Sequence, residues 1–216
     1  MINEIHAWFF RPNNGWDPVP AAHVEQYAAH EWSHVNESLV TEIETWVGGL
    51  QGKRVLDLGG GPGQYSAAFA RRGAKVTWHD VSRRYLELAS ARSKSAGLDI
   101  HYSLGYLESA ERFVSDPFDL LFNRICWNYS MSDSRFASLL YRLVKPGGYG
   151  FVDTDLYTGT PGSPIRRAQR WLYDRRIVKI GHPFPRRGVM QSYMHRLPIQ
   201  IVDKSTTTND RIFFRK

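Results

Sequence analysis

The stretch Val55-Leu56-Asp57-Leu58-Gly59-Gly60-Gly61-Pro62-Gly63 decides how this chain of 216 residues folds. Its first half belongs to an apolar run, Arg54–Leu58, which is typical of a buried strand. The glycines that follow permit a tight turn whose backbone a ligand can approach without meeting a Cβ atom. Their spacing is G-x-G-x-G, whereas the dinucleotide fingerprint is G-x-G-x-x-G, and the lysine of a P-loop is missing. An acid before the turn, Asp57, suits a ligand with a cationic amine better than one with a pyrophosphate.

Strand-like and helical stretches alternate after this turn. The pattern predicts helices over Gln64–Arg72, Arg83–Ala96, Ser134–Val144 and Ile165–Val178. It predicts strands over Arg54–Leu58, Ala74–His79, Ile100–Ser103, Phe118–Cys126 and Tyr149–Asp153, and a final antiparallel hairpin of Ile199–Asp203 and Ile212–Arg215. Such alternation is typical of a parallel sheet with helices on both faces. Before the turn, we expect an irregular aromatic arm over the first twenty residues and two helices between Ala21 and Leu50.

Composition sets the class of protein. Hydrophobic residues make up 42% of the chain, enough for a sizeable core, and the sequence has neither a membrane-spanning run nor a signal-peptide pattern. One cysteine, Cys126, excludes an internal disulfide framework. We therefore expect a soluble, cytoplasmic protein. The net charge of +7 is uneven, since residues 161–216 hold 13 basic and 3 acidic side chains. A field of this kind attracts nucleic acid, phosphorylated ligands or acidic partners, but a solvated helix face gives the same pattern.

A second acid follows the second predicted strand. Asp80, in His79-Asp80-Val81, comes seventeen residues after Gly63. A carboxylate at that strand end can accept both hydroxyls of a ribose, and Val81 would pack against an adjacent base. Two acids around a glycine turn describe a nucleoside with a positive, amine-bearing tail. S-adenosylmethionine fits this description.

Four segments resemble the class I S-adenosylmethionine-dependent methyltransferases, especially the group similar to the ubiquinone and menaquinone biosynthesis enzymes. They are V-L-D-L-G-G-G-P-G, V-T-W-H-D-V-S, F-D-L-L-F-N-R-I and L-V-K-P-G-G-Y-G-F-V-D, within about Gln51–Asp153. The resemblance implies a three-layer, doubly wound α/β fold with a mostly parallel seven-stranded sheet of order 3-2-1-4-5-7-6, its last strand antiparallel. It also implies one domain overall, with residues 1–50 as an N-terminal arm and lid helices and residues 51–216 as the cofactor-binding methyltransferase domain.

The resemblance implies a set of cofactor contacts as well. The family usually has an acid after the glycine of the third-strand motif, and Tyr106 stands in that place here. Tyr106 or the backbone of Leu107 would then serve the adenine amino group. The full expected set is Asp57 near the amine, partly through water, Gly59, Gly60, Gly61 and Gly63 along the methionine part, Asp80 on the ribose, Val81, Tyr106 and Leu107 at adenine, and Asn123 beside the methyl donor.

In methyl transfer from a sulfonium, the main role of the protein is to align the reactants and to exclude water. An oxygen acceptor of high pKa also requires a general base. From the lid helices, His34 and His30 are the candidate bases. The candidate acceptor contacts are Tyr27, Trp32, Trp127, Asn128 and Tyr129. The run from His30 to His34 also spells the H-E-x-x-H of zinc proteases. Because no third-ligand motif follows and the predicted sheet leaves no room for that fold, we reject a protease and predict no metal site.

Three functions remain open at this point. The first is methylation of an oxygen or nitrogen of a small molecule, such as an aromatic or secondary metabolite. The second is RNA methylation, with nucleic acid bound to the basic segment 165–187. Against it, the sequence shows neither a base-methylation tetrad nor an appended RNA-binding domain. The third is a non-catalytic cofactor-binding domain. We expect a small-molecule acceptor as partner, no membrane, and an assembly compatible with a homodimer. The basic side chains of the second hypothesis are Arg166, Arg167, Arg170, Arg175, Arg176, Lys179, Arg186 and Arg187.

Overall fold

The computed structural model describes residues 2–159 and 162–216 and contains one seven-stranded sheet. The strand order is β3-β2-β1-β4-β5-β7-β6, which confirms the predicted order. The strands are β1 (Arg54–Leu58), β2 (Lys75–Asp80), β3 (Ile100–Leu104), β4 (Phe118–Arg124), β5 (Val144–Asp155), β6 (Gln200–Asp203) and β7 (Asn209–Arg215). β1 to β5 pair in parallel, whereas β7 pairs antiparallel with both β5 and β6.

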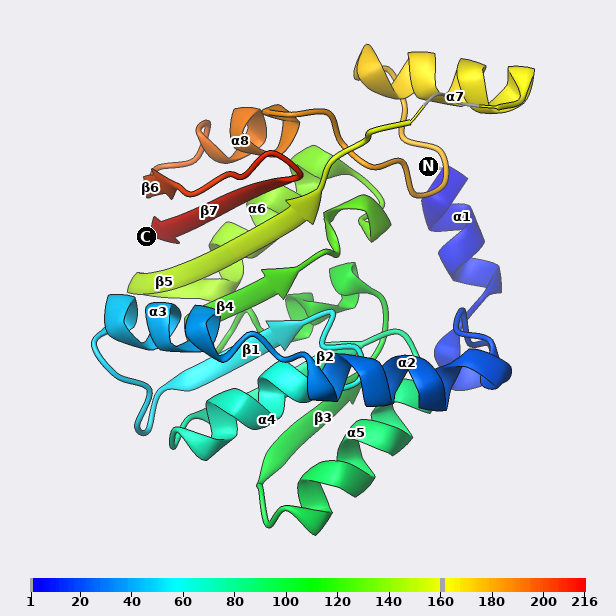
Figure 1. Ribbon diagram of the computed structural model, residues 1–216. Coiled ribbons are helices and arrows are strands. Elements are labelled where there is room, and N and C mark those ends of the chain that lie inside the picture. Colours follow the sequence, from blue (N-terminus) through cyan, green and yellow to red (C-terminus); the bar gives the residue numbers. More distant parts are fainter. Residues whose placement is uncertain (1, 160–161) are drawn as a thin grey trace.

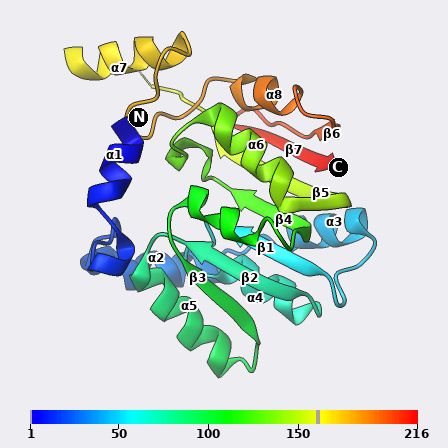
Figure 2. The same cartoon turned by 180° about the vertical axis from the view of Figure 1, so that it is seen from behind.

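Helices cover both faces of this sheet. They are α3 (Glu37–Val47), α4 (Gln64–Arg71) and α5 (Arg83–Ser95), and then α6 (Asp133–Leu143) and α8 (Val189–Met194), whereas α7 (Pro164–Asp174) lies apart from the sheet (Figure 1). α3 and α4 lie in front of the sheet in Figure 1, and α6 and α8 lie in front of it when it is seen from behind in Figure 2. The arrowheads of β1, β4 and β5 point toward the edge where the N-terminal helix α1 (Ile2–Phe9) lies (Figure 1).

The core consists of two apolar layers separated by the sheet. Successive side chains of a strand point to opposite faces. Phe151 of β5 therefore packs on the side of α3 and α4, with Ile43 and Phe69, while its neighbour Val152 packs on the side of α6 and α8, with Phe136. Both faces of β5 are buried, as expected for a parallel sheet with helices on each side.

The N-terminal segment differs from its prediction. Instead of an irregular arm, the structure has α1, the 3₁₀ helix η1 (Pro12–Asn14), and then the two expected helices, α2 (Ala21–Ser33) and α3. The helix α1 is stabilised by contacts distant in sequence: Asn3 Nδ2 donates to the carbonyl of Lys179 at 3.2 Å, and Glu4 pairs with Arg135 of α6. Because tertiary contacts override local propensity, the sequence of this segment did not predict its helix.

The segment between α7 and β6 also contains an unpredicted helix. The elements predicted from the sequence leave residues 179–198 without a helix, yet α8 forms there and buries Met190 and Met194. Gly188 precedes it with φ +78° and donates its N–H to Asp210 Oδ2 at 2.6 Å. Two 3₁₀ helices, η2 (Leu107–Phe113) and η3 (Trp127–Tyr129), follow β3 and β4. None of the helices formed by residues 2–159 and 162–216 is long and apolar enough to cross a membrane.

Candidate cofactor and acceptor site

The glycine turn lies between β1 and α4, and its glycines serve two purposes. A Cβ atom at Gly63 would lie 2.6 Å from the Cβ atom of Ala89, and one at Gly59 would overlap Cys126 Sγ. At Gly61, where φ is +48°, nothing lies within 4 Å of the Cβ position. Gly59 and Gly63 therefore permit close packing inside the protein, whereas Gly61 presents bare backbone to open space. That space is where a ligand can approach the turn.

Strand β2 fixes the open part of the turn. Trp78 Nε1 donates to the Gly61 carbonyl at 3.1 Å, and the Gly61 N–H donates to Asp80 Oδ2 at 2.9 Å. The other carboxylate oxygen of Asp80 accepts from Ser82 N at 2.9 Å. A carboxylate has about four lone-pair sites, so Asp80 keeps acceptor capacity for the hydroxyls of a ligand. Sequence reasoning identified Asp80 but missed Trp78, whose ring faces Gly60.

The electrostatics of the turn favour a cation. Asp57 is buried and accepts a hydrogen bond from Ser66 Oγ at 2.7 Å. The pKa of Asp57 is raised to about 7, chiefly by burial; the hydrogen bond from Ser66 opposes the rise, and the negative charge of Asp80 adds to it. Burial also raises the pKa of Asp80. A positive group beside the two carboxylates would favour their charged forms.

The end of β3 is fixed by a buried histidine. His79 Nδ1 lies 2.9 Å from Ser103 Oγ, and His79 Nε2 lies 2.8 Å from the carbonyl of Tyr106. Burial lowers the pKa of His79 to about 4, so the ring is neutral at pH 7 and its Nε2–H donates to that carbonyl. The side chain of Tyr106 points toward the N-terminal segment, where its hydroxyl donates to the carbonyl of Phe10 at 2.6 Å and its ring stacks on Trp16.

The N-terminal segment also caps α5. The carboxylate of Asp17 accepts from Ser82 Oγ and from the backbone N–H of Arg84, both at 2.9 Å. An acid at a helix N-terminus satisfies free N–H groups and interacts favourably with the helix dipole. Asp17 and Tyr106 together hold the N-terminal segment beside Val81 and Asp80, the expected ribose and adenine contacts. Sequence reasoning did not identify Asp17.

Beyond the turn, β4 ends in residues that contact β1. Asn123 Nδ2 donates to the carbonyl of Leu58 at 2.7 Å, and its Oδ1 atom is buried with no hydrogen-bond partner among the described residues. Ile125 adopts φ 57°, a conformation that costs free energy for a β-branched residue. The thiol of Cys126 packs against Gly59, and burial raises its pKa, so it stays protonated at neutral pH.

The expected acceptor contacts lie in different environments. Trp127 does not face an open acceptor site: its ring is fully buried and packs on Phe136 at 5.5 Å, because η3 turns it into the core. Asn128 is buried as well. Tyr129 is 53% exposed and lies beside His182, and Tyr27 is 46% exposed and lies beside Tyr85. Only these two tyrosines offer rings to a ligand without rearrangement.

The remaining lid residues make structural contacts. Trp32 Nε1 donates to the carbonyl of Pro62 at 2.8 Å, so α2 is attached to the glycine turn. His30 and His34 are exposed, and their rings stack on each other at 4.2 Å. His34 Nδ1 lies 2.9 Å from the carbonyl of His30, which occupies that nitrogen as a donor. Within the described ranges, no group of three or more His, Cys, Asp or Glu side chains is arranged to hold a metal ion.

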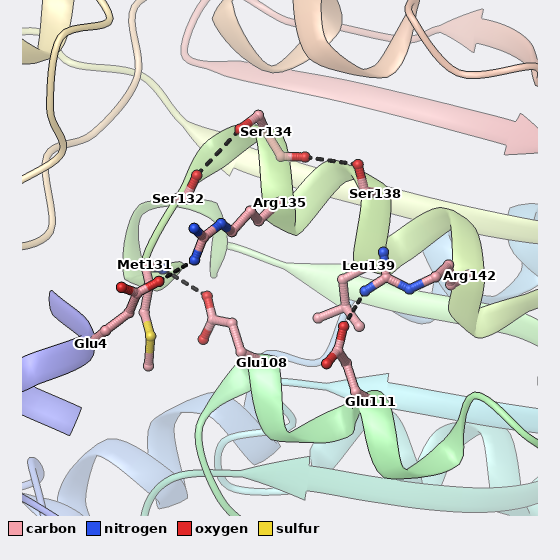
Figure 3. A pocket seen from close by; sticks show the side chains of 10 residues that line it. All are labelled: Glu4, Glu108, Glu111, Met131, Ser132, Ser134, Arg135, Ser138, Leu139 and Arg142. Carbon is pink, nitrogen blue, oxygen red and sulfur yellow. Dashed lines mark hydrogen bonds and ion pairs between the residues drawn. The ribbon is translucent and has the colours of Figure 1, made fainter. Parts of the chain in front are cut away.

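A cavity of about 540 Å³ lies away from the turn. It lies between η2 and α6 (Figure 3). Several of the side chains that line it are charged, and four of them form the ion pairs Arg135–Glu4 and Arg142–Glu111. None of its lining residues belongs to the glycine turn or to the ends of β1 and β2. We therefore place the candidate site at the turn, where the polar groups converge, and not in this cavity.

Much of the basic segment is engaged within the protein. Lys179 is buried and donates to Asp133 Oδ1 at 2.7 Å, and Arg170 is buried beneath Tyr157. Arg186 pairs with Asp174, Arg187 pairs with Asp210, and Arg176 donates to Ser192. Five of the eight side chains considered for phosphate binding thus have partners inside the protein. This arrangement gives no support to an RNA-binding face.

Comparisons with known proteins agree with this geometry. A family model described as a methyltransferase domain matches residues 55–148. The ubiquinone biosynthesis O-methyltransferase of Rhizobium johnstonii is 29% identical over 145 residues, 67% of this chain and 55% of that protein. The protein of the same name from Pseudomonas entomophila is 34% identical over 105 residues, 49% of this chain and 45% of that protein. The chain therefore spans about half the length of these two relatives.

The fold comparison gives the same class. A structure of an S-adenosylmethionine-dependent methyltransferase from Aquifex aeolicus superposes with a TM-score of 0.60 at 15% identity, covering 91% of this chain and 98% of that one. At this identity the likeness concerns the fold. The family model, the curated relatives, the shared fold and the strand order together support a class I methyltransferase.

Proposed function

We propose that the chain transfers a methyl group from S-adenosylmethionine to an oxygen of a small molecule. The observation that carries the proposal is the open backbone at Gly61, flanked by Asp57 and by the unused acceptor sites of Asp80. A ribose and an ammonium group fit these two acids. The names of the relatives, which are O-methyltransferases, support oxygen as the acceptor atom.

Each part of the chain would have its own task. Asp80 would hold the ribose hydroxyls, Asp57 would balance the amine, and Val81 with the backbone of Leu107 would border the adenine. The cofactor, when bound, supplies an activated methyl group for an in-line displacement. Residues 1–50 would serve as the lid that excludes water, and residues 51–216 as the domain that holds both reactants. Tyr27 and Tyr129 are the exposed rings available to an acceptor.

Titration calorimetry with S-adenosylmethionine and with S-adenosylhomocysteine tests the cofactor assignment. Loss of two hydrogen bonds to a charged group weakens binding by about 100-fold or more. We therefore expect saturable binding by the wild type and this loss in Asp80→Asn. Asp116→Asn is the matched control, because this exposed carboxylate pairs with Arg54 at the opposite end of β1. Absence of binding by the wild type, or equal binding by Asp80→Asn, would contradict the proposal.

A further inference from the structure

Three charged side chains lie side by side at the carboxyl edge of the sheet. Arg124 ends β4, Asp153 is its register partner on β5, and Arg211 is the partner of Asp153 on β7. Their strand neighbours Phe122, Phe151 and Phe213 all belong to the core layer on the side of α3 and α4. Since side chains alternate along a strand, the three charged groups emerge on that same face, next to α2 and α4.

This cluster contains two guanidinium groups, of Arg124 and Arg211, but only one carboxylate, that of Asp153. The Asp153 side chain is 1% exposed and accepts a hydrogen bond from Arg211 Nη2 at 3.1 Å. Arg124 Nε lies 3.7 Å from the same carboxylate oxygen, which is too far for a hydrogen bond. Within the described residues, the Arg124 Nε atom has no hydrogen-bond partner, although it is buried. The Arg124 side chain remains 29% exposed, so its guanidinium is accessible to a ligand.

Arg124 also lies between the glycine turn and the lid. Its guanidinium stands 5.4 Å from the centre of the Tyr65 ring. Its charge acts on Tyr27 of α2 and on Cys126, whose thiol contacts Gly59, and in both cases it opposes the rise that burial causes in the pKa. Arg124 therefore lies near Tyr27 of α2 and near the thiol that contacts the glycine turn, so an acceptor bound beside the turn would come close to it.

The acidic groups nearest to this region already have other partners. Glu31 of α2 accepts from Gln64 Nε2 at 3.0 Å, and Asp155 accepts from Asn209 Nδ2 at 2.7 Å. Among the described residues, Glu31 and Asp155 therefore leave the guanidinium of Arg124 without a hydrogen bond. A guanidinium binds a carboxylate or another anionic oxygen through charge-assisted, often paired, hydrogen bonds.

We propose that Arg124 is the anion-binding residue of the acceptor site, and that the acceptor carries an anionic oxygen, either a carboxylate or an ionised phenol. This inference rests on the proposed function. Asp153 and Tyr65 hold the Arg124 side chain in place. Arg211 keeps Asp153 paired, so a neutral residue at position 124 does not leave a buried charge alone.

Matched pairs of small phenols test this inference. The first pair is 3,4-dihydroxybenzoate and its methyl ester, and the second is 4-nitrocatechol, ionised at neutral pH, and catechol, which is not. Each is titrated into protein saturated with S-adenosylhomocysteine. Charge-assisted hydrogen bonds predict that the anion of at least one pair binds about ten-fold or more tightly than its neutral partner. The pair that shows the preference distinguishes a carboxylate from a phenolate.

The variants then assign the preference to one side chain. Arg124→Gln removes it, while Arg215→Gln keeps it, because Arg215 lies at the other end of β7 over Tyr149. Arg124→Lys restores it only in part, since an ammonium lacks the planar fork. S-adenosylhomocysteine binds all four proteins equally. No preference in either pair, or a preference that survives Arg124→Gln, overturns the inference. Failure of the wild type to bind S-adenosylhomocysteine instead overturns the proposed function, and the inference with it.

Discussion

The two halves of the carboxyl edge of the sheet are built in different ways. The cofactor half consists of the ends of β1 and β2, where Asp57, Gly61 and Asp80 lie in one continuous segment of the chain. The Gly61 N–H donates to Asp80, and the charge of Asp80 acts on Asp57. The acceptor half brings together Arg124, Asp153 and Arg211 from three distant parts of the chain. The first half is therefore visible as a sequence motif, whereas the second exists only once the sheet has formed.

The largest effect is expected from alanine substitutions of two adjacent glycines of the cofactor half, Gly60 and Gly61. One should lower the unfolding free energy and the other should weaken cofactor binding. Gly60→Ala places a Cβ atom against the buried Trp78 ring, and such overpacking costs about 1–3 kcal/mol of unfolding free energy. Gly61→Ala meets open space, so its cost is the left-handed backbone alone, about 1 kcal/mol. Its Cβ atom would instead obstruct the ligand and weaken cofactor binding by about 10-fold or more. Denaturant unfolding and calorimetry measure the two effects, and the reverse pattern would refute the assignment.

The acidity of Asp57 predicts a smaller, pH-dependent effect. Binding of a cationic ligand needs the ionised form, and the pKa in the free protein is about 7. Affinity for S-adenosylmethionine should therefore fall by about ten-fold from about pH 8 to about pH 6. Because the folded pKa lies above the ordinary 3.8, this group makes the free protein less stable as the pH rises from 3.8 to about 7.

Asp57→Asn is the control for this pH dependence. The amide does not ionise, so the variant should lose the pH dependence of cofactor binding and should be more stable than the wild type above about pH 7. Calorimetry and thermal unfolding across the pH range measure both quantities. Identical pH profiles for the two proteins would show that Asp57 does not balance the charge of the ligand.

The smallest effect concerns the hydrogen bond that joins Tyr106 to the N-terminal segment. Tyr106→Phe removes the hydrogen bond to the carbonyl of Phe10 and keeps the stacking on Trp16. One such bond is worth about 0.5–1.5 kcal/mol, so the N-terminal segment should be cleaved a few-fold faster in limited proteolysis. Tyr141→Phe, on α6 beside Lys216, is the matched control. Equal cleavage rates for Tyr106→Phe and wild type would mean that this bond does not hold the segment.

The sequence predicted the glycine turn and the two acids because these depend on local patterns: apolar runs, glycine spacing and an acid at a strand end. The strand order came instead from the resemblance to a known family. Sequence reasoning missed Trp78 and Asp17, whose roles depend on which backbone groups they meet after folding. It also expected Trp127 to face the acceptor, but η3 buries that ring. The helix α1 was missed because contacts with Lys179 and Arg135, which are distant in sequence, stabilise it.

The crystal structure of the protein with S-adenosylhomocysteine tests the central claim most directly. The account predicts the ribose hydroxyls on the carboxylate of Asp80, the amino group toward Asp57, and the ligand backbone across the open face of Gly61. A ligand bound instead in the cavity between η2 and α6, with Asp80 still contacted by the protein alone, would contradict it.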